Sequence, residues 1–227
     1  VIPRTGYIVE FNALWYNALK IMARLAEKYE NKQLCRKYLE MAEKTKKSFD
    51  EKFYNEEKHC LYDVLGDSKV RPNQLFALSL SHPIVDNAEI AEQVLNTVEN
   101  KLLNRYGLQT LSSDEEGYVD VYEGSAYNRD SSYHQGITWP WLLGLYYDAL
   151  KNTMIIEKNR TKRQELEEKI TKLVYTTKET FKSEMFERSS IGTISEIYDS
   201  TEPYEERGAF AQAWSVAEIF RIVLNKR

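Results

Sequence analysis

The sequence has few of the residues that cross-link a chain or interrupt its regular structure. Among 227 residues there are two cysteines, five prolines and nine glycines. Two cysteines cannot form a disulfide framework, so we interpret Cys35 and Cys60 as free thiols of a cytoplasmic protein. Three histidines and two separated cysteines offer no ligand set for a metal, and nothing implies another cofactor. Because no stretch has the composition of a linker, we expect residues 1–227 to belong to one domain.

Long apolar runs and a basic surface are also missing. No stretch approaches the ~18 apolar residues that a membrane-spanning helix needs, and nothing resembles a secretory signal peptide. Lysine and arginine total 31 against 35 acidic residues, and the basic residues are interleaved with glutamate instead of clustered. Because nucleic-acid binding needs a concentrated positive surface, we expect neither nucleic acid nor a membrane as a partner.

The sequence does contain apolar residues spaced by three and four, which is typical of amphipathic helices. Asp86 and Glu89 suit a capping box at a helix start, and Pro140 suits a first helical turn. The only strand candidate is a short pair, Phe53-Tyr54 with Leu61-Tyr62. We expect helices over residues 12–29, 33–50, 86–101, 135–150, 160–187 and 207–225, the apolar fourth lying inside and the charged fifth outside.

A polar residue recurs at the expected helix starts. Asn12, Asn73 and Gln135 are 61 and 62 residues apart, and a further 61 residues lead to Glu196. A unit of that length holds a helical hairpin and a loop. Repeated hairpins stack in an open solenoid or close into a toroid, and in both cases equivalent helix ends share one face. The polar and aromatic residues at these starts are therefore predicted to gather at one rim as a site.

Two irregular segments add acidic and aromatic residues to this rim. Residues 102–133 show little helical pattern, and structureless loops of such length are usually functional. Their carboxylates and five tyrosines suit a polyhydroxyl ligand, although a solvated loop with aromatic anchors fits the same composition. Glu196 lies between Ile194 and Ile197 just before an expected helix, where apolar neighbours hold a side chain firmly.

Six sequence blocks stand out along the chain. They are Glu10-Phe-Asn-Ala-Leu-Trp-Tyr-Asn-Ala-Leu19, Arg71-Pro-Asn-Gln74, Tyr106-Gly-Leu-Gln-Thr-Leu111, Tyr133-His-Gln-Gly136 with Trp139-Pro-Trp141, Ser195-Glu-Ile-Tyr-Asp199, and Arg207-Gly with Ala211-Gln-Ala-Trp-Ser-Val216. In this order the blocks resemble the glucosidase domain of glycogen debranching enzymes. Any one block alone would be a weak signal, whereas the ordered set is specific.

The resemblance implies an all-α fold, namely an (α/α)6 barrel related to glucoamylases, of which this chain would be a C-terminal portion. It also implies hydrolysis of α-1,6-linked glucose at branch points of glycogen, limit dextrin or another branched α-glucan, with inversion. An inverting glycosidase uses one carboxylic acid to protonate the leaving oxygen and one carboxylate to activate water, ~6.5–9.5 Å apart. The family's base motif falls on Ser195 to Asp199, which makes Glu196 the expected general base.

The resemblance further implies which residues bind glucose. The expected substrate-binding residues are Glu10, Asn12, Arg71, Asn73, Gln74, Asp130, His134, Gln135 and Trp139. A helix-cap role would explain His134 as well. Trp15 and Trp214 are expected to pack within inner helices.

The general acid of the family is not expected in this chain. In the family it is an Asp shortly before a Pro-Arg-Thr-Gly stretch, which here is residues 3–6, so the matching Asp would precede residue 1. At the observed interval the chain also holds only about three and a half hairpins. We therefore expect a truncated domain that is inactive alone and is completed by an upstream part of the same polypeptide.

Two alternatives remain open from the sequence. A helical-repeat scaffold that binds proteins would have helix pairs of ~34–47 residues and no clustered acids. A different glucosidase of the same barrel type, acting on trehalose or a mannosyl-oligosaccharide, would share much of the pattern.

Overall fold

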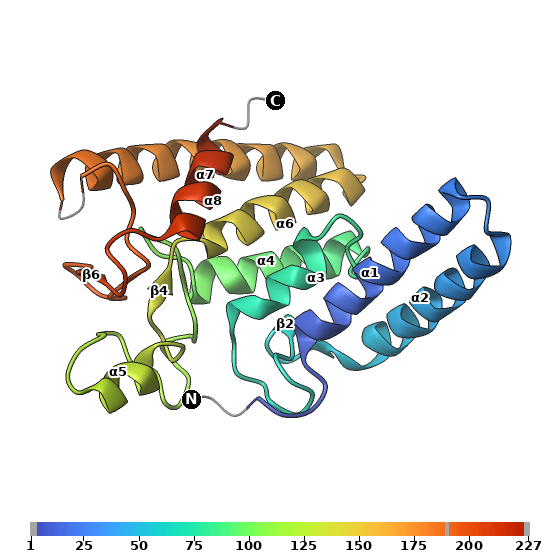
Figure 1. The fold of residues 1–227 in the computed structure, drawn as a ribbon, viewed down its shortest axis with the longest axis horizontal. Coiled ribbons are helices and arrows are strands. Elements are labelled where there is room, and N and C mark those ends of the chain that lie inside the picture. The colour runs from blue at the N-terminus through green and yellow to red at the C-terminus, as the bar shows by residue number, and fades with distance from the viewer. Residues whose placement is uncertain (1–3, 189–190, 225–227) are drawn as a thin grey trace.

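The computed structural model describes residues 4–188 and 191–224 and consists mainly of helices (Figure 1). The all-α fold class predicted from the sequence is confirmed. The helices are α1 (Val9–Lys28), α2 (Lys32–Lys52), the short 3-10 helix η1 (Pro72–Leu75), α3 (Phe76–Ser79), α4 (Ala88–Lys101), α5 (Ala126–Ser132), α6 (Leu142–Ile156), α7 (Arg160–Glu187) and α8 (Ala213–Leu224). Residues 1–3, and residue 225 of the last predicted helix, lie outside the described residues.

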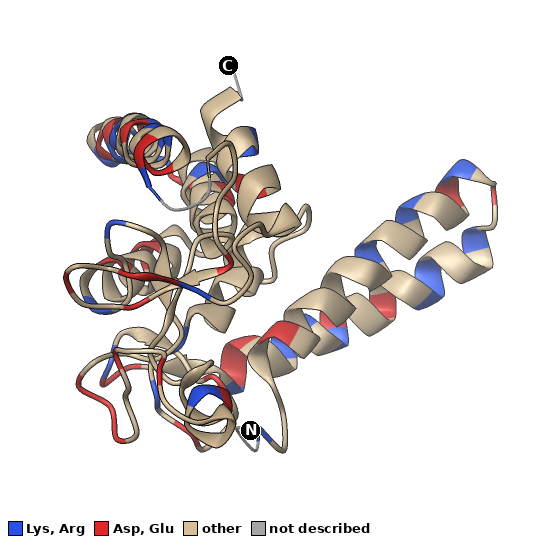
Figure 2. Ribbon diagram, turned by 60° about the vertical axis from the view of Figure 1, so that its left-hand side comes forward, with Lys and Arg blue, Asp and Glu red and all other residues tan. Residues whose placement is uncertain are grey.

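The helices pack mostly against their neighbours in sequence. α1 and α2 form one long antiparallel hairpin, and α6 and α7 form another. α3 contacts both α1 and α6, and α8 contacts both α6 and α7. Figure 2 shows the α1–α2 hairpin extending away from the rest of the described chain, with basic and acidic residues intermingled along it. The hairpin organisation predicted from the repeat interval is therefore present.

The core is centred on α6, as its apolar sequence predicted. Leu142, Leu143, Tyr146 and Leu150 of this helix are buried, and each side chain of that size contributes roughly 1.5–3 kcal/mol of hydrophobic free energy. α7 covers α6 from outside with one buried apolar stripe and an otherwise charged surface. The stripe contains Leu166, Ile170, Leu173 and Phe181.

Asparagine side chains begin three of the helices. Asn31 and Asn159 accept hydrogen bonds from backbone N–H groups in the first turns of α2 and α7. Asn87 does the same for α4, accepting from Glu89 and Ile90. The predicted capping box starting at Asp86 is therefore wrong by one residue, because the amide of Asn87 satisfies the free N–H groups instead.

Two predicted helix starts are wrong as well. Residues 134–136 form a turn and α6 begins only at Leu142, so Pro140 precedes the helix. α8 begins at Ala213 instead of residue 207. Gly136 and Gly208 have φ values of +137° and +69°, which a right-handed helix cannot contain. Instead of continuing these helices toward the N-terminus, the segments before α6 and α8 each contain a short β-strand.

Within the described part of the chain, six two-residue strands form two antiparallel sheets. β1 (Tyr54–Asn55) pairs with β2 (Cys60–Leu61), which confirms the predicted pair with a shift of one residue. A four-stranded sheet in the order β3-β4-β5-β6 was not predicted, because two residues are too few for an alternating pattern. Its strands are β3 (Leu108–Gln109), β4 (Thr138–Trp139), β5 (Ile197–Tyr198) and β6 (Glu206–Arg207). This sheet joins the two irregular segments that the sequence singled out.

Both cysteines of the chain are free thiols. Burial raises the pKa of the Cys60 thiol to about 11, so this side chain behaves as a small apolar residue and not as a nucleophile. Within residues 4–188 and 191–224, no helix combines the length and the apolarity needed to cross a membrane.

Candidate functional site

A cavity of about 540 Å³ lies where η1, α5, the turn before β4 and the start of α8 meet. Its size is within the range of ~300–1,000 Å³ that is usual for ligand sites. Five residues predicted from the sequence line it, namely Arg71, Asn73, Asp130, His134 and Trp139. A larger hollow of about 1080 Å³ follows the solvent side of α7 and brings together none of the predicted residues. The smaller cavity is therefore the candidate site.

One wall of the cavity is aromatic. The ring of His134 lies nearly parallel to that of Trp139, with centroids 5.2 Å apart. Trp141 stacks on Trp214 at 5.5 Å, and Trp214 meets Trp139 edge-on at 5.9 Å. Flat apolar faces of this kind suit the apolar faces of sugar rings.

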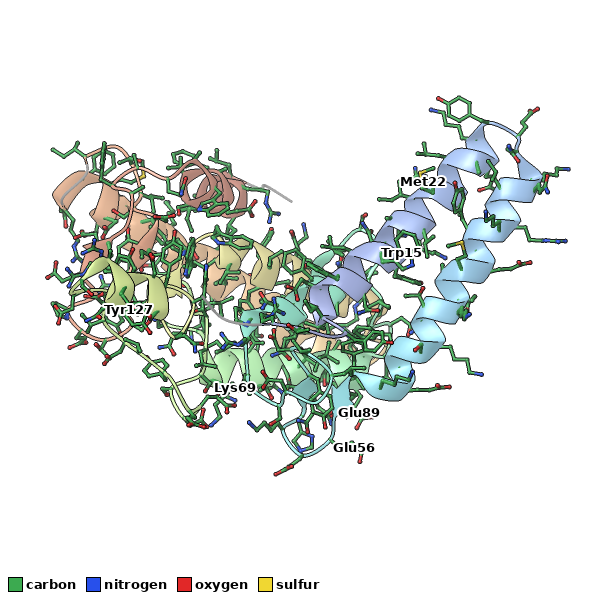
Figure 3. All side chains as sticks on the ribbon, turned by 60° about the horizontal axis from the view of Figure 1, so that its bottom comes forward. Trp15, Met22, Glu56, Lys69, Glu89 and Tyr127 are labelled. Atoms are coloured by element: carbon green, nitrogen blue, oxygen red, sulfur yellow. The ribbon has the colours of Figure 1, made fainter. Side chains whose placement is uncertain are left out.

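The two tryptophans expected to pack inside helices differ in their surroundings. Trp214 contacts the aromatic wall but remains 45 % exposed, so it is only partly packed. Trp15, on α1, is 51 % exposed (Figure 3). The expected packing of Trp15 is not found within the described residues, because the buried face of α1 is formed by other residues, among them Ala13, Tyr16 and Ala23.

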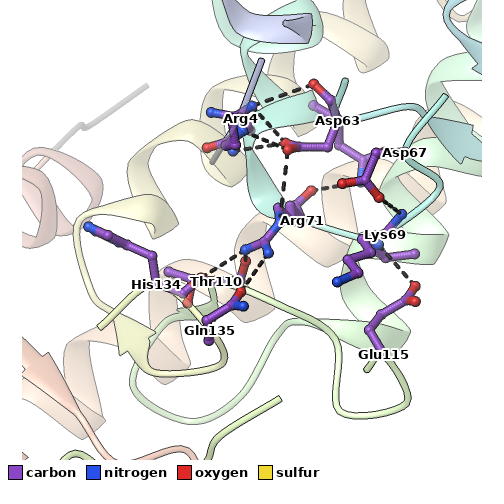
Figure 4. A network of polar contacts seen from close by, with 12 residues as sticks. Arg4, Asp63, Asp67, Lys69, Arg71, Thr110, Glu115, His134 and Gln135 are labelled. Atoms are coloured by element: carbon purple, nitrogen blue, oxygen red, sulfur yellow. Dashed lines mark hydrogen bonds and ion pairs between the residues drawn. The ribbon is translucent and has the colours of Figure 1, made fainter. Parts of the chain in front are cut away.

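The opposite wall is a network of charges centred on Asp63 (Figure 4). Arg4 donates to Asp63 from Nε at 2.7 Å and also binds Glu10, with Nη1 2.5 Å from Oε1. Asn73 donates to Asp63 at 2.9 Å, and Nε of Arg71 lies 3.9 Å from Asp63. Burial raises the pKa of Asp63, whereas Arg4, Asn73 and Arg71 act against that rise. The network therefore presents Arg4 and Asn73 to the cavity in fixed positions.

Arg71 connects this polar wall to the turn before β4. Its Nη1 donates to the carbonyl oxygens of Thr110 and His134, and its Nη2 donates to Oε1 of Gln135 at 2.6 Å. Partial burial, followed by the charge of Arg71, lowers the pKa of His134. His134 is therefore a neutral ring at pH 7 that can donate or accept one hydrogen bond on each side.

The remaining predicted binding residues are engaged within the protein. Gln74 is buried, accepts from the backbone of Leu61 and donates to the carbonyl of Arg71. Asn12 donates to the carbonyl of Ile8, the N-cap residue of α1. Together with the Arg4-bound Glu10, these side chains are not on the cavity wall, and their part in binding stays a prediction.

Glu196 directly precedes β5 and is held by donors on both carboxylate oxygens. Oε1 accepts from the hydroxyl of Tyr133 at 2.5 Å and from Nε2 of Gln212 at 3.2 Å, and Oε2 accepts from the backbone N–H of Ala209 at 3.0 Å. Hydrogen bonds to an ionised carboxylate are about twice as strong as neutral ones. The side chain is thus fixed in orientation, and Tyr133 links it to the cavity wall.

Gly208 lies against the same carboxylate. A Cβ atom at this position would lie within van der Waals overlap of Oε2 of Glu196. The positive φ of Gly208 is also one that other residues rarely adopt. Two separate reasons therefore favour glycine at position 208: the backbone conformation of the turn after β6 and the close approach of the Glu196 carboxylate.

Several residues of the site were not identified from the sequence. Asp63 lies in a segment without a recognisable motif, so no local signal could have found it. Tyr133 and Trp141 belong to the sequence block of residues 133–136 and 139–141, but their roles depend on tertiary contacts that the sequence does not indicate. Among the described residues, no group of three or more His, Cys, Asp or Glu side chains is placed to hold a metal ion.

Comparison with known proteins places the chain in a family. Residues 1–221 match the amylo-alpha-1,6-glucosidase family. A solved sialidase superposes with a TM-score of 0.67 at 13 % identity, over 92 % of this chain and 19 % of that one. The GH63 mannosylglycerate hydrolase from Thermus thermophilus, in complex with Tris, superposes with a TM-score of 0.61 at 14 % identity, over 96 % of this chain and 45 % of that one.

The same hydrolase in complex with glucose gives a TM-score of 0.58 at 14 % identity, over 96 % of this chain and 47 % of that one. At such low identity these similarities show the fold, which is that of helical-barrel glycosidases, and the chain spans less than half the length of either structure. Because the family match covers nearly all of the sequence, the chain belongs to the amylo-alpha-1,6-glucosidase family and is a domain of the glycoside hydrolase type.

Proposed function

We propose that the polypeptide containing this chain hydrolyses α-1,6-linked glucose at branch points of glycogen or limit dextrin, with inversion, and that Glu196 is its general base. The observation that carries the proposal is the way in which Glu196 is held: Tyr133, Gln212 and the backbone of Ala209 fix its carboxylate, and Tyr133 itself lines the aromatic cavity. The free cysteines agree with a cytoplasmic location, where glycogen is stored.

The chemistry assigns separate tasks to the two walls. The aromatic wall stacks on the glucose ring, while Arg4, Asn73 and the neutral His134 bind its hydroxyls. The carboxylate of Glu196 takes a proton from a water molecule as the water oxygen attacks C1 from the face opposite the glycosidic oxygen. The C1–O bond breaks, a general acid protonates the departing oxygen, and glucose leaves with inverted configuration.

Among the described residues near the cavity, we identify no carboxylate that could serve as the general acid. Glu10 and Asp63 are already bound to Arg4, and Asp130 on α5 is exposed at the cavity edge. We propose that the acid comes from another part of the polypeptide. Residues 1–227 alone are then expected to bind sugar weakly and to hydrolyse nothing.

Exposed apolar stripes support a larger assembly of helices. Most of the exposed apolar residues of α1 lie on the side away from the face buried against α2, and this stripe continues to Tyr29, which directly follows the helix. These residues are Phe11, Leu14, Trp15, Met22, Leu25 and Tyr29. α8 also exposes Trp214, Phe220 and Leu224. Stripes of this size seldom face water in a finished fold, so we propose that helices from the rest of the same polypeptide cover them and complete the barrel.

The test uses the full-length enzyme with limit dextrin as substrate. Glu196→Gln keeps the shape of the side chain and should lower kcat by about 10²- to 10⁴-fold, and NMR of the first product should show β-glucose. The control is Glu56→Gln, on the exposed loop between β1 and β2 (Figure 3), which should change nothing. Near-normal turnover by Glu196→Gln would exclude the assigned base, and α-glucose as first product would exclude inversion.

A second candidate is an α-glycosidase of the same barrel type with another substrate, such as trehalose or a mannosyl-oligosaccharide. It is favoured by the likeness of the fold to the GH63 hydrolase. The rates of the full-length enzyme on limit dextrin, trehalose and mannosyl-oligosaccharide decide between the two. A protein-binding scaffold would instead show no change in tryptophan fluorescence when glucose or an iminosugar is titrated, although Trp139, Trp141 and Trp214 line the cavity.

A further inference from the structure

The hydroxyl of Tyr133 makes the shortest contact to Glu196. It donates to Oε1 at 2.5 Å, while Gln212 reaches the same oxygen at 3.2 Å. Tyr133 is the C-terminal cap of α5, and Glu196 is 63 residues later. Because the two side chains come from separate segments, the contact joins the loop of residues 102–133 to the segment before β5.

The ring of Tyr133 is fixed by the aromatic wall. It lies 4.7 Å from the ring of Trp139, 4.6 Å from His134 and 5.7 Å from Tyr122, measured between centroids. The indole N–H of Trp139 also donates to the carbonyl oxygen of Tyr133. The hydroxyl therefore cannot move without the wall on which the sugar stacks.

The phenol group is suited to donate and not to exchange protons. Burial, and then the hydrogen bond to Glu196, raise the pKa of Tyr133 well above its usual range. The hydroxyl thus stays protonated at every pH at which a glycosidase works. Tyr133 supplies a permanent donor to the carboxylate, and a donor to the charged form favours ionisation of the acceptor.

We infer that Tyr133 is a positioning residue for the general base: its hydroxyl aims the carboxylate of Glu196 at the attacking water, and its ring couples that carboxylate to the sugar-binding wall. The inference rests on the proposed function, because it needs Glu196 to act as the base. Gln212 and the backbone of Ala209 hold the rest of the carboxylate, which leaves one oxygen edge for water.

His134 is the neighbouring group that must be considered together with Glu196. Burial and the charge of Arg71 lower its pKa, whereas Glu196 acts against that fall. Because a lowered pKa places the titration of His134 in the acid range, a shift of the acidic limb in one variant alone does not identify its source. Opposite shifts for a removed and a strengthened Tyr133 donor do identify it, because both changes act at the hydroxyl that binds Glu196.

The experiment compares kinetic parameters and pH profiles of full-length variants on limit dextrin. Tyr133→Phe keeps the ring and removes the donor, so kcat should fall about 10- to 100-fold with KM within about threefold. The acidic limb of kcat should move to higher pH. The control is Tyr127→Phe, on the helix α5 that Tyr133 caps; Tyr127 is 80 % exposed, and this variant should match the wild type.

A second variant distinguishes the loss of the hydrogen-bond donor from a general loss of folding. Incorporation of 3-fluorotyrosine at position 133 retains the ring and makes the hydroxyl a stronger donor, so the acidic limb should move to lower pH, opposite to Tyr133→Phe. Glu196→Gln is assayed in parallel to separate the two proposals. If Glu196→Gln is inactive while both Tyr133 changes leave kcat and the limb unaltered, the positioning role is excluded and the proposed function stands.

The other outcomes are equally decisive. A rise in KM with unchanged kcat and limb would make Tyr133 a sugar-binding residue only, which contradicts the inference. Full activity of Glu196→Gln would remove the base from position 196 and overturn the proposed mechanism together with the role of Tyr133.

Discussion

Arg4 binds both carboxylate oxygens of Asp63, 59 residues later in the chain, with Nε 2.7 Å from Oδ2 and Nη2 2.9 Å from Oδ1. The same guanidinium holds Glu10 at the start of α1. The contact thus ties the segment before α1 to the loop after β2, and Asp63 passes the constraint on to Asn73 of η1. One buried carboxylate therefore determines the geometry of the whole polar wall.

Replacing this carboxylate should be costly. Asp63→Asn keeps the shape but removes the negative charge that faces the buried Arg71, and it leaves Glu10 as the remaining carboxylate bound to Arg4. Loss of one member of a buried charge pair costs about 3–5 kcal/mol of unfolding free energy, which chemical denaturation of the full-length enzyme would measure. Glu56→Gln, on the exposed loop between β1 and β2 (Figure 3), is the control and should cost less than about 1 kcal/mol. Equal effects of the two substitutions would contradict the central role of Asp63.

A second buried carboxylate should make stability depend on pH. Glu184 of α7 accepts from the hydroxyl of Tyr198 at 2.9 Å and lies 3.6 Å from Arg188. Burial, followed by the neighbouring Glu206, raises the pKa of Glu184 to about 7.

Since the folded state holds this proton more tightly than the unfolded chain, the stabilising contribution is complete below about pH 4 and is lost as pH rises through 7. Glu184→Gln mimics the protonated form and should flatten the decline of unfolding free energy between about pH 5 and 8, a difference on the order of 2 kcal/mol. Thermal melts across this range test it. Parallel curves for wild type and variant would show that Glu184 is ionised in the folded state.

The positions of the helices could be predicted from the sequence more accurately than the side of each helix that is buried. Residues 160–187 form a helix as predicted, with the predicted apolar stripe buried. In α1 the helix is also correct, but the stripe that predicts it, including Leu14 and Leu25, is exposed. The buried face has Ala13 and Ala23, whose small side chains let α2 approach closely. Periodicity detects a helix with two apolar faces and cannot say which face its neighbour will cover.

The candidate site shows the same division. The repeat interval brought Asn73 and His134 to one rim, because equivalent hairpin ends share a face. The interval predicted both residues at helix starts, whereas the structure places Asn73 in the 3-10 helix η1 and His134 in the turn before β4. The contacts of Tyr133 with Glu196 cross 63 residues and depend on a sheet too short to leave a sequence pattern. Such contacts follow from tertiary packing and not from local propensity.

A substitution at Gly208 should displace the base. In Gly208→Ala the new Cβ would overlap Oε2 of Glu196, and φ of +69° disfavours alanine in addition. We expect kcat of the full-length enzyme to fall at least about 10-fold and unfolding free energy to fall by about 1–2 kcal/mol. Gly192→Ala is a matched control, because Gly192 has a φ of +83° with open space around it. It should show the backbone cost without the loss of kcat, so an equal loss of kcat in both would exclude a direct effect on Glu196.

The exposed stripe of α1 provides the last prediction. Met22 is 42 % exposed on this stripe (Figure 3). If the stripe faced water, a lysine at this position would leave the unfolding free energy nearly unchanged. If helices of the same polypeptide cover it, as proposed, Met22→Lys buries an unpaired charge and should lower the unfolding free energy of the full-length enzyme by about 2–4 kcal/mol. Glu40→Lys, on the exposed side of α2, also replaces the exposed ion pair with Arg36 by a like-charge pair, and it should lower the unfolding free energy by no more than about 1 kcal/mol. The contrast between the two lysines measures coverage directly, because both positions accept the same side chain on one hairpin and differ in what the rest of the polypeptide places against them.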